Sequence, residues 1–218
     1  MPRHLQNHNL SILDSRTFNG LPLMYDKSPF IREYLQSIHD VMLQALDDYA
    51  QVFAFRVDLK LPARGLLPSY AFTNEVIRRF LASFKAKIDH NRSMARRSNR
   101  YAHLSKVRYA WAREVAGSER PHYHLVILLN RSSFHELGNF KSKQGNIFNR
   151  LEEAWASALS LDRDLIKGLI NIPKNPVYEL TRSDLRGQEA FFHRASYLCK
   201  VATKVYGDRH HGFGASRG

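Results

Sequence analysis

The sequence has one cysteine and no long apolar run. Cys199 alone cannot form an internal disulfide, and no stretch approaches the roughly 20 apolar residues that cross a bilayer. The polar N-terminus, MPRHLQNHNLS, lacks the apolar segment of a signal peptide. No repeat occurs, nor does the Gly-x-x-x-x-Gly-Lys-Ser/Thr motif of a helicase-type ATPase. These absences predict a cytoplasmic protein without a membrane partner.

Acidic residues are scarce relative to basic ones. The 218 residues include 33 Lys and Arg but only 20 Asp and Glu, which gives a formal net charge of +13. Such an excess favours a polyanionic partner, and nucleic acid is the commonest. The alternative at this point is a basic but merely solvated surface.

The spacing of apolar residues predicts an α+β fold. Residues 1–30 are polar and irregular, typical of an extended arm or a small cap, and residues 31–218 form a single domain. We expect an antiparallel or mixed sheet covered by helices. The predicted helices span 31–50, 73–97, 145–160 and 187–205, and the predicted strands span 51–60, 104–115, 121–129, 168–172 and 177–181.

The triplet His122-Tyr123-His124 is the most distinctive local feature. It opens the apolar segment PHYHLVILL, which is typical of a buried strand. Because residues two apart in a strand point the same way, the two imidazoles share one face. Neutral imidazole is a common metal ligand, so the pair can chelate one ion. With 11 histidines in the chain, chance also supplies such a triplet, and the interpretation depends on partners.

Glu114 is the first candidate partner of the histidines. It lies near the end of the preceding strand, and the short segment AGSER separates the two strands. In a hairpin it comes close to both imidazoles, and a carboxylate beside two imidazoles suits Mn²⁺ or Mg²⁺. The sequence leaves the strand register open, and with it the alternative of a surface ion pair with Arg113 or Arg120.

Tyr197 and Lys200 form the second candidate. They stand in the segment SYLCK of the last predicted helix. Residues three apart share a helix face, so Lys200 can stabilise charge on a phosphate near the tyrosine oxygen. Tyrosine, with an ordinary pKa of about 10, is a poor nucleophile without such help. The alternative is an ordinary tyrosine packed against the sheet.

These parts follow one another in the order of a known family. The strand VFAFRVDLKLP, Glu114, the His-hydrophobe-His triplet and a late Tyr-x-x-Lys resemble the HUH endonucleases, which include rolling-circle initiators and relaxases. The segments FRVDLKLP, RYAWAREV, PHYHLVILLN and FHRASYLCKVATK more closely resemble the inovirus replication-protein family, the YagK/YfjJ-type proteins of filamentous phages and prophages. This resemblance covers about residues 20–215.

The resemblance implies both a fold and a reaction. The fold is a central antiparallel sheet with a ferredoxin- or RRM-like core, which carries the histidine strand and is covered by helices. Mg²⁺ or Mn²⁺ is held by His122, His124 and Glu114, while Tyr197, assisted by Lys200, attacks the scissile phosphate of single-stranded DNA. A 5′-phosphotyrosine link and a free 3′-OH result, so nicking and rejoining need no nucleotide. The expected setting is rolling-circle replication of a phage or mobile element in a bacterial cytoplasm.

Single-stranded DNA or a DNA hairpin at an origin is the implied partner, and a host helicase would supply unwinding. Tyr206 does not share the face of Tyr197, so we expect one catalytic tyrosine. Asp58 either supports the metal site or pairs with Arg56, and the ion pair is favoured. The alternative for residues 92–100 is a flexible solvated loop. The predicted DNA contacts are Arg92, Arg96, Arg97, Arg100, Lys106 and Arg108.

Two other functions remain open from the sequence. A non-catalytic DNA-binding regulator of replication or transcription that retains the fold would explain the charge without a reaction. A phosphoesterase that uses water in place of tyrosine would explain the metal ligands, but it would leave free products and no covalent adduct.

Overall fold

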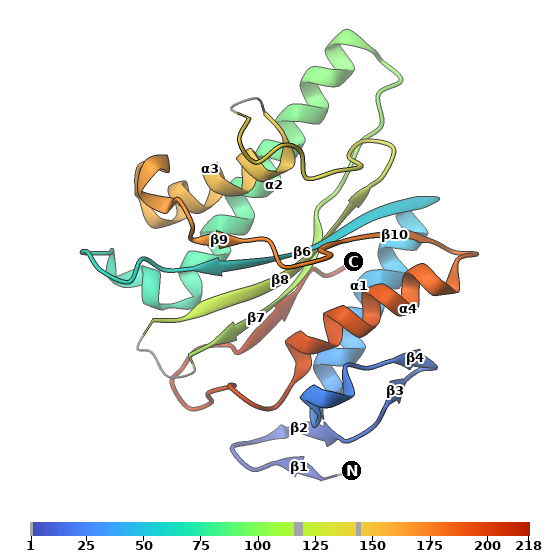
Figure 1. Cartoon of the computed structure of the whole chain (residues 1–218), viewed down its shortest axis with the longest axis vertical. Helices are drawn as coiled ribbons and strands as arrows, with labels where there is room; N and C mark the ends of the chain where they lie inside the picture. Colours follow the sequence, from blue (N-terminus) through green and yellow to red (C-terminus); the bar gives the residue numbers. More distant parts are fainter. Residues whose placement is uncertain (1, 116–119, 143–144) are drawn as a thin grey trace.

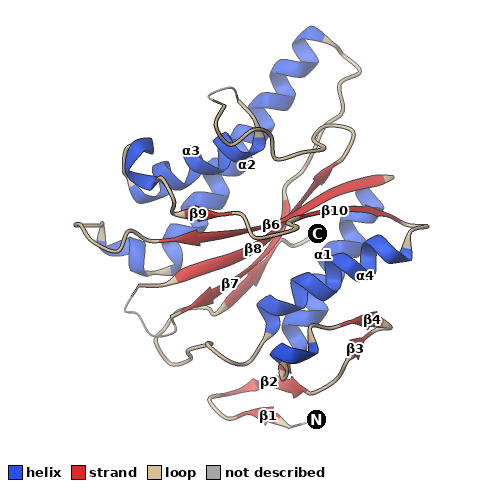
Figure 2. Cartoon of the chain, in the orientation of Figure 1, coloured by secondary structure: helices blue, strands red, loops and turns tan. Residues whose placement is uncertain are grey.

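The computed structural model describes residues 2–115, 120–142 and 145–218. At its centre is a six-stranded antiparallel sheet, with helices on both faces (Figure 1, Figure 2). This arrangement confirms the predicted α+β fold and its central antiparallel sheet. Most of the predicted turn at 116–120 lies outside the described residues.

The strand order of the sheet is β10-β6-β8-β7-β11, with β9 also paired to β6. The histidine strand β8 therefore lies inside the sheet, between β6 and β7. The predictions at 51–60 and 177–181 match the structure, whereas the strands predicted at 104–115 and 168–172 are shorter. The strands are β6 (Gln51–Lys60), β7 (Arg108–Glu114), β8 (His122–Asn130), β9 (Ile170–Asn171), β10 (Val177–Thr181) and β11 (Phe213–Ala215).

Both faces of the sheet are buried, which explains the near-continuous apolar run of β8. Phe53 and Phe55 on β6 pack into the core beneath α2 (Asn74–Ser98) and α3 (Ile147–Leu159), together with Leu125 and Ile127 on β8. The alternate residues of β6 and β8 pack into a second core beneath α1 (Arg32–Asp48) and α4 (Leu185–Ala195). Strands that are buried on both faces consist mainly of apolar residues, because neither face contacts water. The histidines of β8 are therefore exceptions that need a reason.

The helices form where an apolar stripe meets a capping residue. Thr73 caps α2 by accepting a hydrogen bond from the backbone N–H of Glu75 at 3.1 Å. The first three predicted helices are confirmed to within a few residues. Of the described helices, none is long and apolar enough to cross a lipid bilayer. The helices are α1 (Arg32–Asp48), α2 (Asn74–Ser98), α3 (Ile147–Leu159) and α4 (Leu185–Ala195).

The predicted last helix, 187–205, is wrong in its second half. The α-helix ends at Ala195, and a short 3-10 helix, Ser196–Cys199, follows. Beyond it the chain pairs with a distant segment, because Lys200 bridges Phe30 and the N–H of Val201 donates to Pro29 at 2.8 Å. Tertiary pairing thus overrides the local helical pattern at the segment that carries Tyr197.

The N-terminal segment contains short antiparallel strands and packs on the α1/α4 side of the molecule (Figure 1). The N–H of Met24 donates to Ser196 Oγ at 3.0 Å, and Phe30 is fully buried. These contacts hold the 3-10 helix Ser196–Cys199 in position. Its elements are β1 (Arg3–His4), β2 (Asn7–Leu13), β3 (Thr17–Phe18), β4 (Leu21–Pro22) and β5 (Phe30–Ile31).

Candidate metal centre

Strand pairing places Glu114 directly opposite His122. In the antiparallel pair β7–β8 the Cα partners are Glu114 with His122 and Ala112 with His124. The carboxylate and both imidazoles therefore lie on one face, in the register that the sequence left open. Glu114 Oε2 lies 3.6 Å from His122 Nε2 and 3.3 Å from His124 Nε2. One potential ligand atom from each residue lies within 4.8 Å of the others.

This donor set fits a divalent metal ion. Two imidazole nitrogens and one carboxylate oxygen are three protein ligands, which leave coordination positions for water or a substrate oxygen. Within the described residues, His124 Nε2 is buried and makes no hydrogen bond of good geometry, although the Glu114 carboxylate lies 3.3 Å away. Such a nitrogen costs free energy unless something satisfies it, and a metal ion would do so. The His122 side chain is 29% exposed, so the cluster is open to solvent on one side.

Asp58 fixes the orientation of His124. The pairing of β6 with β8 sets the two residues opposite each other, and Asp58 Oδ1 lies 2.7 Å from His124 Nδ1. A proton on Nδ1 that is donated to this carboxylate leaves the Nε2 lone pair free for a metal. Arg56 Nε also donates to Asp58, at 3.2 Å. Burial tends to raise the pKa of Asp58, but His124 and Arg56 outweigh burial and lower it. Asp58 therefore both pairs with Arg56 and supports His124.

Two lysines meet the other oxygen of Glu114. Lys200 Nζ lies 3.2 Å and Lys204 Nζ 3.4 Å from Oε1. Burial tends to raise the pKa of Glu114, but the two imidazoles and Lys204 hold that pKa well below its usual range. Burial lowers the pKa of Lys204 to about 8. Glu114 thus stays ionised, with one oxygen facing the histidines and the other facing the lysines.

Tyr197 packs against this cluster. Its ring centroid lies 5.2 Å from that of His124, with the two planes nearly perpendicular. The guanidinium carbon of Arg56 lies 4.3 Å and Lys200 Nζ 3.8 Å from the centroid of the Tyr197 ring. The prediction that Tyr197 and Lys200 share an α-helical face is wrong, because they lie in and just after the 3-10 helix. That tighter turn nevertheless brings the ammonium group over the ring.

Tyr206 is engaged elsewhere. Its hydroxyl lies 3.2 Å from that of Tyr34, and its ring packs on His4 with centroids 4.5 Å apart. Burial, together with the contact to Tyr34, raises the pKa of Tyr206 above its usual range. Tyr197 is therefore the better placed of the two for chemistry at the cluster.

Most of the predicted DNA contacts lie at the far end of α2 and just beyond it. Arg96, Arg97 and Arg100 are exposed, as is Lys106 before β7. Arg92 is half-buried, with its guanidinium carbon 4.8 Å from the centre of the Phe134 ring.

Arg108 does not fit the predicted DNA-contacting set. It is buried, and its guanidinium donates to Asp48 and to Gln44, each at 2.7 Å. Its charge is therefore used inside the fold. Glu114 lies six residue steps further along β7, which is about 20 Å in an extended strand. The structure does not bring these basic residues to the metal-ligand cluster.

Two residues of the site were missed as functional candidates. The sequence predicts Arg56 only as the ion-pair partner of Asp58, although it also contacts Tyr197. Lys204 is fully buried against Glu114, yet its sequence neighbourhood is an ordinary basic segment. Arg56 and Asp58 are two residues apart on a strand and share one face, so the sequence contains a signal for Arg56. No local pattern predicts the turn that buries Lys204.

The fold and the cluster place the protein in a class of α+β proteins with a candidate metal site on the inner strands of an antiparallel sheet. Here these strands carry the Glu114 carboxylate and the His-x-His pair, and Tyr197 packs beside them. More narrowly, the chain belongs to the YagK/YfjJ C-terminal domain family, whose model matches residues 13–216.

Two relatives from Escherichia coli strain K12 are similar over most of their length. The Uncharacterized protein YfjJ is 29% identical over 195 residues, covering 85% of this chain and 94% of YfjJ. The Uncharacterized protein YagK is 30% identical over 195 residues, covering 86% of this chain and 93% of YagK. No solved structure matches the chain.

Proposed function

We propose that this protein is an HUH-type endonuclease and strand transferase, which nicks and rejoins single-stranded DNA through Tyr197. The observation that carries the proposal is the convergence of Glu114, the two histidines and Tyr197, which come from separate parts of the chain. A buried ligand nitrogen that makes no hydrogen bond among the described residues, beside a tyrosine that two cations contact, supports a functional role. Perturbed polar groups gathered in one place are typical of active sites.

Glu114, His122 and His124 would hold a divalent ion, Mg²⁺ or Mn²⁺. Bound there, the ion supplies Lewis-acid polarisation of a phosphate oxygen. Asp58 keeps the ligand nitrogen of His124 oriented, and the two lysines keep Glu114 ionised without occupying the oxygen that faces the histidines.

Tyr197 provides the nucleophile. Its phenolic oxygen bonds to phosphorus as the bond from phosphorus to the 3′ oxygen breaks, and the phenol loses a proton while the 3′ oxygen gains one. Arg56 and Lys200, both against the ring, stabilise the negative charge that develops on the phenolic oxygen. One phosphoester replaces another, so the step is reversible and needs no nucleotide.

The family likeness supplies the biological setting of the proposal. A 5′-phosphotyrosine link with a free 3′-OH suits the start of rolling-circle replication of a filamentous phage or other mobile element. The DNA partner would be a single strand or a hairpin at an origin. A host helicase in the bacterial cytoplasm would unwind the duplex.

Trapping the covalent adduct tests the proposal. Single-stranded oligonucleotides of random sequence, labelled at the 3′ end, are incubated with the protein and Mn²⁺ and then run on a denaturing protein gel. We expect label on the wild-type protein, on Tyr206→Phe as the matched control, and none on Tyr197→Phe or in EDTA. Adduct on Tyr197→Phe would show that the nucleophile is another residue.

A DNA-binding regulator that retains the fold is the second candidate. It is favoured by the exposed arginines of α2, because the hollow that they line contains none of the metal ligands among its described residues, and DNA could bind there without reacting. Such a protein would bind DNA and form no adduct. A water-dependent phosphoesterase would instead release cut DNA without attached protein.

A further inference from the structure

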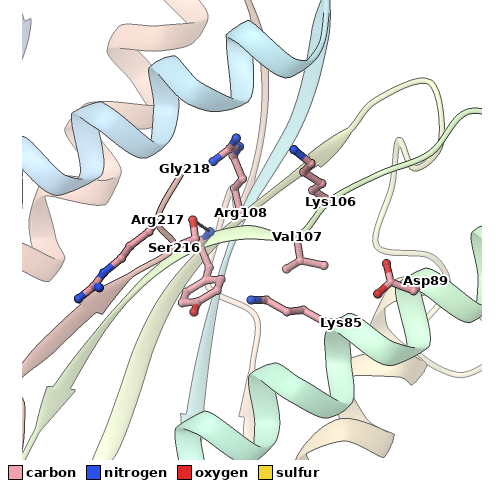
Figure 3. Close-up of a pocket in the computed structure, with 9 residues that line it drawn as sticks. Lys85, Asp89, Lys106, Val107, Arg108, Ser216, Arg217 and Gly218 are labelled. Carbon is pink, nitrogen blue, oxygen red and sulfur yellow. Dashed lines mark hydrogen bonds between the residues drawn. The ribbon is translucent and has the colours of Figure 1, made fainter.

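A concentration of positive charge lies at the opposite end of β7 from the metal-ligand cluster. Two adjoining hollows, of about 390 and 600 Å³, open where the second half of α2 passes the start of β7. They share Asp89 and Lys106, and together we term them the basic groove. In Figure 3, Lys85 and Lys106 lie on opposite sides of the first hollow, with Arg217 on a third side. The cationic residues that line the basic groove are Lys85, Arg92, Arg96, Arg97, Lys106, Arg108 and Arg217.

Carboxylates leave most of this charge unneutralised. Arg108 is paired with Asp48, and Lys106 Nζ lies 3.9 Å from the same carboxylate. Among the described residues, the other five groove cations form no ion pair with a carboxylate. Asp89 is the acidic side chain among the described lining residues. The basic groove therefore carries a net positive field that suits a polyanion.

Three of the four groove cations on α2 form a row along one face of the helix. Lys85, Arg92 and Arg96 are spaced by seven and four residues, which keeps them on the same side. From Lys85 to Arg96 the helix rises about 17 Å. Figure 1 shows the C-terminal end of α2 extending beyond the sheet. Over this length a DNA duplex rises by about five base-pair steps of 3.4 Å.

The two aromatic residues among the described lining residues of the basic groove, Tyr49 and Tyr109, each contact a groove lysine. Lys85 Nζ lies 4.8 Å from the centre of the Tyr109 ring and covers it. The hydroxyl of Tyr49 accepts a hydrogen bond from the N–H of Lys106 at 2.8 Å. Sites for unpaired strands rely on stacking against open rings, whereas cations in a row contact a phosphate backbone.

We propose that the basic groove binds the phosphate backbone of double-stranded DNA, apart from the place of strand transfer. That the polyanion is DNA rests on the proposed function. Glu114 and Arg108 lie about 20 Å apart along β7. The groove opens toward α2, whereas the cluster lies on the α1/α4 face of the sheet. A short single strand at the cluster therefore does not reach the basic groove, and a longer DNA with a duplex arm does.

Binding of a blunt-ended duplex of arbitrary sequence, followed by fluorescence anisotropy in EDTA, tests this inference. The test variant combines Arg96→Gln, Arg97→Gln and Lys106→Gln, which are all exposed groove positions. Its matched control removes the same charge elsewhere through Arg3→Gln, Lys141→Gln and Lys167→Gln, also at exposed positions.

We expect the groove variant to bind the duplex at least about tenfold more weakly, while the control stays within about twofold of wild type. The slope of log K against log salt should fall by about 2.7 for three lost contacts. Equal losses in both triple variants would overturn the inference, as would a larger loss for a single strand than for the duplex. EDTA prevents metal-dependent chemistry, so the binding assay does not depend on strand transfer. Loss of adduct formation would refute the proposed function, whereas equal duplex binding by both triple variants would refute the role of the basic groove.

Discussion

The contact between Asp58 and His124 permits a sharp test of the metal centre. Asp58→Asn keeps the size of the side chain but removes its charge from a 2.7 Å contact with His124 Nδ1 and a 3.2 Å contact with Arg56 Nε. The imidazole then loses the anion that makes it a stronger ligand and that fixes its orientation. We therefore expect the variant to bind Mn²⁺ more weakly.

The expected size of this effect follows from the geometry. Loss of a carboxylate that holds a metal-ligating histidine costs about 10–100-fold in metal affinity, or about 1.4–2.8 kcal/mol. The variant also leaves Arg56 buried without its counter-charge, since only 5% of its side chain is exposed. Breaking such a pair costs about 3–5 kcal/mol of folding stability.

Asp48→Asn is the matched control. It breaks the comparable ion pair with Arg108, which is also largely buried but lies at the other end of β7. Mn²⁺ affinity is measured by electron paramagnetic resonance, and stability by urea unfolding of the same samples. We expect both variants to lose stability and Asp58→Asn alone to lose Mn²⁺ affinity. Unchanged Mn²⁺ binding in Asp58→Asn, or an equal loss in both, would refute the reasoning.

Two further predictions concern the lysine at the site and the core beneath α2. Lys200→Met removes a cation from both Glu114 and the Tyr197 ring, so Mn²⁺ should bind at least as tightly while adduct formation slows about 100-fold. A parallel loss of Mn²⁺ binding would instead indicate structural damage. Phe80→Ala should cost about 3–5 kcal/mol in urea unfolding, because Phe80 is fully buried against Trp155. Met94→Ala, at a half-exposed position of the same helix, should cost far less, and equal losses would contradict this view of the core.

The spacing of apolar residues predicts most helices and strands, because each of these elements buries one or both faces and its apolar residues recur with the helical or strand period. The alternation in residues 51–60 gave β6 with its bounds, since both of its faces pack against a core. The prediction failed after Ala195, where no local pattern signals the change. There the pairing of Lys200 and Val201 with the segment at Pro29 decides the conformation.

The site could be predicted in part, for a related reason. A strand period puts His122 and His124 on one face, but only the register of β7 against β8 puts Glu114 opposite them. Arg108 is predicted to contact DNA because no residue near it in the sequence indicates its ion pair with Asp48, which lies on α1. Contacts between residues far apart in the chain, such as Lys204 with Glu114, are set by the packing of whole elements.

The charges at the cluster bear on what it can bind. Arg56, Lys200 and Lys204 outnumber the carboxylates Glu114 and Asp58, even before a divalent ion is added. A surplus of positive charge in a mostly buried site disfavours a neutral or cationic ligand and favours an anionic one, as the phosphodiester of the proposed reaction is. The two oxygens of Glu114 serve different neighbours, so an ion can enter on the histidine side while the lysines stay in place. The nucleophile candidate and the anion-attracting groups then occupy one site together, whereas a plain structural metal centre would need neither Tyr197 nor the lysines.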